Sequence, residues 1–218
     1  MPDLFSYLNH PDCCPNRRPK PKDIFSLLFF YFIVVTPLVM IIFIICKLLN
    51  ITHKEIDLTQ RINLFWGVIL APIYEEILFR SLLKFKKINI LLFSITLFVL
   101  SIAEFYKSRA EIAVFLSILL VGFLSLLIIF SRNRIESYLS SRFNYFFYAT
   151  ILLFGLLHAT NFTGNPYTIL AFSFILGSPQ LVVGSILGYI RMNHGLFYSI
   201  LFHVVLNSTM LFSLIGHH

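Results

Sequence analysis

The stretch IFSLLFFYFIVVTPLVMIIFIICKLL, residues 24–49, decides the fold. It contains one charged residue, Lys47, and as a helix it is long enough to cross a hydrocarbon core of about 30 Å. The whole chain is 58% hydrophobic and 12% charged, whereas soluble domains carry about 25% charged residues. One water-soluble core cannot bury so much apolar surface in 218 residues. The composition therefore predicts an integral membrane protein of the all-α class.

Further apolar runs follow the first one, separated by short polar segments. We expect membrane spans at residues 24–49, 62–83, 88–105, 112–130, 143–161, 167–190 and 195–214. The 167–190 run forms one span, or two if the Gly-Ser-Pro sequence at 177–179 is a turn. The sequence thus predicts a polytopic transmembrane helical bundle of seven or eight spans, with residues 24–218 as a single domain. The basic, Pro-rich residues 1–23 are expected to form a poorly ordered cytoplasmic tail.

The net charge of +7 is explained by orientation in a lipid bilayer. Lys and Arg concentrate before residue 24, at 84–87, at 131–142 and at Arg191, which lie on one side of the predicted bundle. Cytoplasmic loops carry an excess of these residues, so we predict a multi-pass chain with its N-terminus in the cytoplasm. No nucleic-acid partner is expected. The three cysteines show neither disulfide-framework nor zinc-site spacing.

The second predicted span carries charged residues in the sequence EEILFR, residues 75–80. Such residues cost at least about 2.5 kcal/mol each in a membrane and usually face the bundle interior. Glu76 and Arg80 are four apart, so they share a helix face and can pair, whereas Glu75 is rotated from Glu76 by about 100°. We expect one carboxylate to be structural and the other to be free to react. The alternative is an inert Glu76–Arg80 pair with Glu75 snorkelling.

Two later spans carry histidines. The fifth contains FGLLH, which ends at His158, and the last contains HVVLN, in which His203 and Asn207 share a face at i, i+4 spacing. Alternatively, His158 is a hydrogen-bonded interior residue, and His203 and Asn207 form polar contacts between helices. Gly184 and Gly188 have the small-xxx-small spacing, and we interpret them as packing residues.

Together, EEILFR at 75–80, FGLLH at 154–158 and HVVLN at 203–207 resemble the CAAX-processing and bacteriocin-processing family of intramembrane proteases, which is related to type II CAAX prenyl endopeptidases. Its motifs are EExxxR, FxxxH and HxxxN on separate transmembrane helices. The resemblance covers about residues 65–210. Two features depart from the pattern: the interval between Arg80 and His158 holds two extra apolar runs, and Ser81 stands where the family usually has Gly.

The resemblance implies a role for each matching residue. Glu75 would be the catalytic carboxylate, with His158 helping it to activate a water. His203 and Asn207 would stabilise the oxyanion, while Glu76 and Arg80 would support the site. The substrate implied is a membrane-anchored peptide or protein. This chemistry suits the residues, because a glutamate removed from bulk water can act as a general base and fixed donors stabilise a developing oxyanion.

Alternatives remain open at this stage. The resemblance favours a metal-free mechanism with no cofactor, but Glu75, His158 and His203 also make a plausible zinc ligand set with one open position. A non-catalytic immunity or partner-binding protein could keep the same bundle. A transporter is a third hypothesis, since intramembrane Glu and His also mark ion paths.

Overall fold

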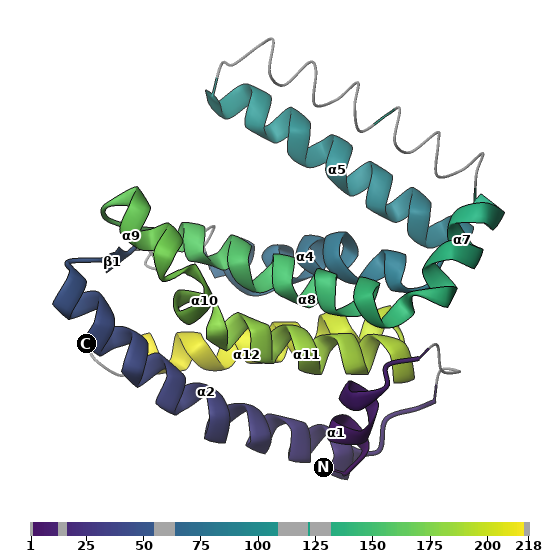
Figure 1. The fold of residues 1–218 in the computed structure, drawn as a ribbon, viewed down its shortest axis with the longest axis horizontal. Helices are drawn as coiled ribbons and strands as arrows, with labels where there is room; N and C mark the ends of the chain where they lie inside the picture. The colour runs from purple at the N-terminus through teal and green to yellow at the C-terminus, as the bar shows by residue number, and fades with distance from the viewer. Residues whose placement is uncertain (1, 13–16, 55–63, 109–121, 123–131, 216–218) are drawn as a thin grey trace.

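The fold is almost wholly helical (Figure 1), as the sequence predicts. The computed structural model describes residues 2–12, 17–54, 64–108, 122 and 132–215. The elements in order are α1 (Pro2–Asn9), α2 (Pro21–Leu49), β1 (Thr52–His53), the π-helical turn η1 (Trp66–Leu70), α4 (Ala71–Arg80), the 3₁₀ turn η2 (Ser81–Leu83), α5 (Lys87–Ser108), α7 (Arg132–Ser141), α8 (Phe143–His158), the 3₁₀ turn η3 (Ala159–Asn161), β2 (Phe162–Thr163), α9 (Pro166–Ala171), α10 (Ser173–Leu176), α11 (Ser178–Asn193) and α12 (Leu196–Ile215).

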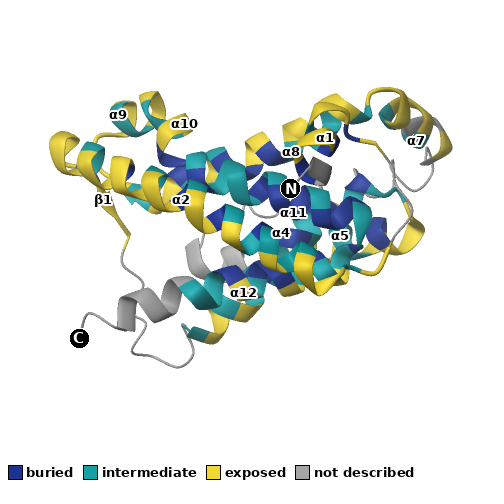
Figure 2. Ribbon diagram, turned by 90° about the horizontal axis from the view of Figure 1, so that it is seen from below, coloured by how far each residue is buried: buried dark blue, intermediate teal, exposed yellow. Residues whose placement is uncertain are grey.

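Helix α11 lies at the centre of the described part and packs against α8, α12, α2 and α1. Two glycines allow its close approach to α8. A Cβ atom added at Gly188 would lie 2.8 Å from the ring of Phe147, and one added at Gly184 would lie 3.3 Å from Phe154. The packing role predicted for these glycines is therefore confirmed. Figure 2 shows the buried residues gathered along α11 and α4, with exposed residues on the outer helices.

The helices match most of the expected spans. Among the described residues, Pro21–Leu49 and Phe143–Asn161 are long and apolar enough to cross a membrane, and shorter apolar stretches occupy Lys87–Ile102 and Leu196–Thr209. The expected 62–83 span is helical over its described residues, 64–83, and composite, with α4 between η1 and η2. The expected 112–130 span lies outside the described residues except for position 122. The number of spans, seven or eight, stays a prediction.

The 167–190 run is broken, which the sequence left open. Helix α9 ends at Ala171, α10 ends at Leu176 and α11 begins at Ser178. The break before α11 coincides with the Gly-Ser-Pro sequence, where Pro179 occupies the first turn of a new helix. Gly177 also lies against the backbone of Gly155, so α8 and this junction touch closely.

Part of the N-terminal segment departs from the poorly ordered tail expected of residues 1–23. Residues Pro2–Asn9 form helix α1, which buries Leu4 and Tyr7 against the bundle. The ring of Tyr7 packs edge-on against Phe147 and Tyr189. Apolar residues at spacing three give α1 a face that can dock, and this burial outweighs the local effect of the prolines.

Segments predicted on one side of the membrane meet at one end of the bundle. At the end that holds α1 and α7 (Figure 1), the Arg17 amide donates to the Asn193 carbonyl at 2.6 Å and Lys84 Nζ donates to the Met192 carbonyl at 2.8 Å. At the opposite end, β1 pairs antiparallel with β2, with Thr52 opposite Thr163. These described contacts therefore lie at opposite ends of the bundle.

Candidate active site

Helix α4 is held at its C-terminal end by α11. Arg191 Nε donates to the Arg80 carbonyl at 2.9 Å, and Arg191 Nη2 donates to the Ser81 carbonyl at 3.3 Å. The Ser81 carbonyl also accepts from the Lys84 amide at 3.4 Å, so the buried arginine adds bonds from α11 to the end of α4 and to the 3₁₀ turn that follows it. In the sequence Arg191 is one of the basic residues that indicate membrane orientation, and its spacing does not predict this contact. However, arginine side chains near helix ends often donate to terminal carbonyls, and the position of Arg191 in the last turn of α11 is a sequence sign of such a role.

The first group of polar side chains, the inner cluster, consists of Glu76, Arg80, Ser199 and His203. The Glu76 carboxylate is fully buried and receives donors on both oxygens. Oε1 lies 3.1 Å from His203 Nδ1 and 3.4 Å from Arg80 Nη1. The Ser199 hydroxyl donates to Oε2. The predicted pairing of Glu76 with Arg80 is confirmed, and two groups from α12 complete it.

Arg80 is buried among apolar neighbours. Its guanidinium carbon lies 4.0 Å from the centre of the Phe154 ring. Neither Nη1 nor Nη2 has a hydrogen-bond partner among the described residues, so the ring face and the Glu76 charge are what stabilise the cation there. The phenylalanine of the FxxxH pattern thus supports a cation on another helix.

The second group, the reactive cluster, consists of Glu75, His158 and His203. Glu75 Oε2 lies 3.6 Å from His203 Nε2 and 3.9 Å from His158 Nε2. The side chain of Glu75 is 18% exposed and that of His158 is 20% exposed, so both are partly accessible. Residues far apart in the sequence, on α4, α8 and α12, are therefore brought together as the sequence predicted.

The hydrogen-bond partner of Nδ1 decides which nitrogen carries the proton in each of the two histidine rings. His158 Nδ1 lies 2.7 Å from the Phe154 carbonyl, which only accepts, so Nδ1 carries the proton. His203 Nδ1 faces the Glu76 carboxylate and carries its proton for the same reason. In each neutral ring the unprotonated Nε2 then points at Glu75.

With both rings neutral, three hydrogen-bond acceptors converge: one carboxylate oxygen and two imidazole nitrogens. Acceptors approach one another this closely only around a shared proton, a donor such as water, or a cation. A water placed there would face a general base, which makes the cluster suited to water activation. Among the described residues no group of three His, Cys, Asp or Glu side chains is arranged to hold a metal ion.

Asn207 lies outside the reactive cluster. Its Nδ2 donates to the carbonyl of Gly67 at 2.9 Å, in the π-helical turn η1. It still shares a face of α12 with His203, as its spacing predicted. The sequence offered no sign that its partner would be a backbone carbonyl.

Ser199 was not among the site residues expected from the sequence, yet it contacts Glu76 in the inner cluster. It is fully buried on α12, four residues before His203, and its hydroxyl contacts Glu76. The signal was present in the sequence, because Ser199, His203 and Asn207 follow one another at spacing four on one helix face.

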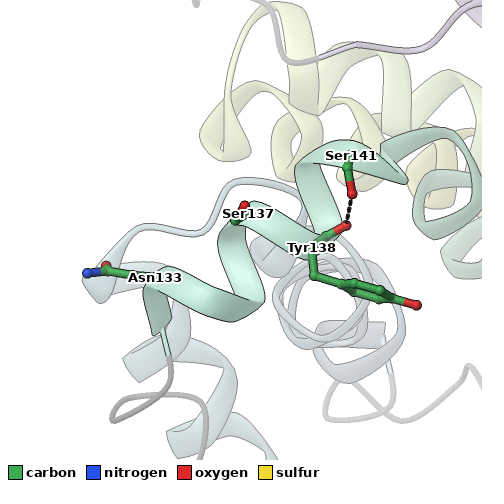
Figure 3. Close-up of a pocket in the computed structure, with 4 residues that line it drawn as sticks. All are labelled: Asn133, Ser137, Tyr138 and Ser141. Atoms are coloured by element: carbon green, nitrogen blue, oxygen red, sulfur yellow. Dashed lines mark hydrogen bonds between the residues drawn. The ribbon is translucent and has the colours of Figure 1, made fainter.

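A surface hollow of about 560 Å³ lies beside α7, away from these clusters in the chain. Asn133, Ser137, Tyr138 and Ser141 line it (Figure 3), and the Ser141 hydroxyl donates to the Tyr138 carbonyl at 2.8 Å. None of these four side chains is a carboxylate or an imidazole. The hollow therefore does not compete with the reactive cluster as a site for acid–base chemistry.

Comparison with family models, with curated proteins and with solved structures gave no match to this chain.

Proposed function

We propose that this chain is an intramembrane endopeptidase that hydrolyses a membrane-anchored peptide with water activated by Glu75 and His158. The observation that carries the proposal is the approach of two imidazole nitrogens to one oxygen of Glu75, at 3.6 and 3.9 Å. Three sequence motifs on three helices meet at this point. Their resemblance to the CAAX-processing and bacteriocin-processing proteases supports the same assignment.

The reaction follows from the arrangement of donors and acceptors. Water held by Glu75 Oε2 and His158 Nε2 gives a proton to the carboxylate while its oxygen attacks the scissile carbonyl carbon. Glu75 then passes the proton to the departing amine as the C–N bond breaks, leaving a carboxylic acid and an amine. His158 keeps its Nε2 directed at the water because the Phe154 carbonyl holds its other nitrogen.

His203 serves the oxyanion in this proposal. To donate from Nε2 it must carry a second proton, and the Glu76 carboxylate on Nδ1 stabilises that imidazolium. A charged donor in a site of low dielectric is worth several kcal/mol to a developing oxyanion. The amide of Asn207 has two N–H groups, of which one donates to Gly67. The resemblance assigns the oxyanion to this residue as well.

We propose further that the chain crosses the membrane several times with its N-terminus in the cytoplasm. Large apolar side chains are exposed along α2, α5 and α8, as lipid-facing helices require: Phe25, Phe29, Phe43, Leu91, Phe98, Leu153 and Leu157. The basic segments gather at one end of the bundle, which fits the excess of positive charge on the cytoplasmic side. Labelling of single cysteines placed in each loop, in intact cells, tests this threading.

The cleavage test uses the purified chain in proteoliposomes with membrane proteins extracted from the source cells. New peptide termini are counted by mass spectrometry for the wild type, Glu75→Gln and His158→Ala. Glu136→Gln, the same chemical change on α7, is the control. We expect termini from the wild type and the control only. Equal termini from all four proteins would overturn the proposal, and a phenotype preserved by Glu75→Gln would favour a non-catalytic partner-binding protein.

The zinc alternative is tested in the same assay. A metal-free glutamate mechanism predicts that dialysis against a strong chelator leaves the cleavage rate unchanged. Loss of cleavage that added Zn²⁺ restores would assign the three converging side chains to a metal instead.

A further inference from the structure

The π-helical turn η1 precedes α4, the helix that carries both glutamates, and Pro72 accounts for its formation. The Ala71 amide donates to the Trp66 carbonyl, five residues back, as in a π-helix. Pro72 follows it and has no N–H to donate. The proline ring would also clash with the carbonyl four residues earlier in a regular α-helix, so the wider turn relieves that contact.

This arrangement leaves the carbonyl of Gly67 without a backbone donor. The amide four residues ahead belongs to Ala71 and is directed at Trp66, and the position five ahead is Pro72. Gly67 is half-buried, and a backbone carbonyl there that lacks a backbone donor takes a partner from elsewhere in the fold. Asn207 Nδ2 supplies it at 2.9 Å, from helix α12.

The same face of α12 contacts the α4 region at three levels. Ser199 reaches Glu76, His203 lies between both glutamates, and Asn207 reaches Gly67 in η1. The three residues follow one another at spacing four, so one rigid helix face fixes the turn and both carboxylates together. A π-turn holds one more residue than an α-turn, so its loss would rotate α4 by about 100° relative to the chain before it.

We propose that Asn207 is a positioning residue that caps the carbonyl orphaned by Pro72, locks the π-helical turn and thereby sets which glutamate of α4 faces the histidines. The structural half of this proposal is independent of any catalysis. The consequence for cleavage rests on the proposed function. Capping the Gly67 carbonyl is a structural role for Asn207, distinct from the oxyanion role that the resemblance implies.

The test is a double-mutant cycle on the purified full chain in detergent, with the apparent Tm as readout. Asn207→Ala is expected to lower Tm by about 3–10 °C, since it leaves a carbonyl without a donor. Pro72→Ala restores an N–H at position 72, so adding Asn207→Ala to it should cost less than half as much. An equal loss in both backgrounds, or no loss in the wild-type background, would overturn the proposal.

A second pair of variants keeps the test independent of Pro72. Asn207→Gln retains an amide donor and is expected to keep most of the Tm, whereas Asn207→Leu, of similar size, is not. Gly67→Ala keeps the carbonyl, and its Cβ meets nothing within 4 Å, so it serves as the control, with a Tm that does not fall. Equal values for the Gln and Leu variants would contradict a hydrogen-bonding role.

Positioning is separated from packing by ¹⁵N spectra of histidine-labelled protein. If the turn sets the rotation of α4, Asn207→Leu shifts the His203 Nδ1 signal, because Glu76 no longer accepts from it. Gly188→Ala, a packing defect against Phe147, should lower Tm without that shift. An unmoved His203 signal in Asn207→Leu would show that Asn207 only packs, whatever the cleavage assay shows.

Discussion

The inner and reactive clusters contain adjacent glutamates on one helix, yet these two carboxylates differ in burial and in most of their partners. Glu76 is fully buried, with a hydrogen-bond donor from α12 on each oxygen and the charged Arg80 guanidinium beside it. Glu75 is 18% exposed and faces two imidazole nitrogens. One step along a helix, about 100° of rotation, separates them. The comparison teaches that two adjacent carboxylates can divide into a fully buried, paired group and a partly exposed group that faces imidazole nitrogens.

His203 belongs to both clusters and connects them. Its Nδ1 donates to Glu76, and its Nε2 faces Glu75. The inner cluster therefore decides which nitrogen of this ring is available to the reactive one. Substitutions in the inner cluster should therefore alter the proposed cleavage through the orientation of the His203 ring. Substitution of Glu75 should leave the contacts of the inner cluster unchanged.

The largest expected effect is on cleavage and comes from Glu75→Gln. The amide cannot accept the proton of the attacking water, so we expect the rate to fall by at least about 10³-fold, within the contribution of general base catalysis. Tm should stay within about 3 °C of the wild type, because Glu75 is not needed to balance Arg80. The rate is measured from new termini and Tm from a detergent thermal shift. A large fall in Tm would place Glu75 among the structural groups.

The second largest effect is on stability and comes from Glu76→Gln. This change leaves the buried Arg80 without its counter-charge, and breaking a buried ion pair costs about 3–5 kcal/mol. We expect poor expression or a strongly lowered Tm. Glu76→Gln combined with Arg80→Met removes both charges and should recover much of the loss. A stable single variant would contradict the division between the two clusters.

The smallest effect sharpens the comparison and comes from Ser199→Ala. It removes one donor to a buried carboxylate, which is worth about 1.5–3 kcal/mol. Ser208→Ala is the matched control on α12, since the Ser208 hydroxyl only returns to the Val204 carbonyl of its own helix. We expect a lower Tm and slower cleavage in Ser199→Ala alone. Equal behaviour of the two serine variants would remove Ser199 from the inner cluster.

Much of this arrangement could be predicted from the sequence because its signals are local. The all-α class follows from composition, and the Glu76–Arg80 pair follows from i, i+4 spacing on one helix. The meeting of Glu75, His158 and His203 was expected only through the resemblance, since spacing within single helices cannot place three helices side by side. The packing of Gly188 against Phe147 completes that placement.

The remaining features depend on contacts between helices. The docking of α1 needs a complementary surface on α8 and α11, which its prolines and basic neighbours do not reveal. The bond from Asn207 to Gly67 requires both the π-helical turn and the register of α12 against it. Pro72 was visible in the sequence, but which carbonyl it would orphan depends on the turn that forms.

The most direct test of the central claim is hydrolysis in water enriched in ¹⁸O, with the purified chain and extracted membrane proteins in proteoliposomes. Attack by water activated at Glu75 places one oxygen from the solvent in each new carboxyl group. We predict new C-termini carrying one ¹⁸O for the wild type and their loss in Glu75→Gln. The same labelled termini at equal yield from both proteins, or none from a folded wild type, would contradict the account.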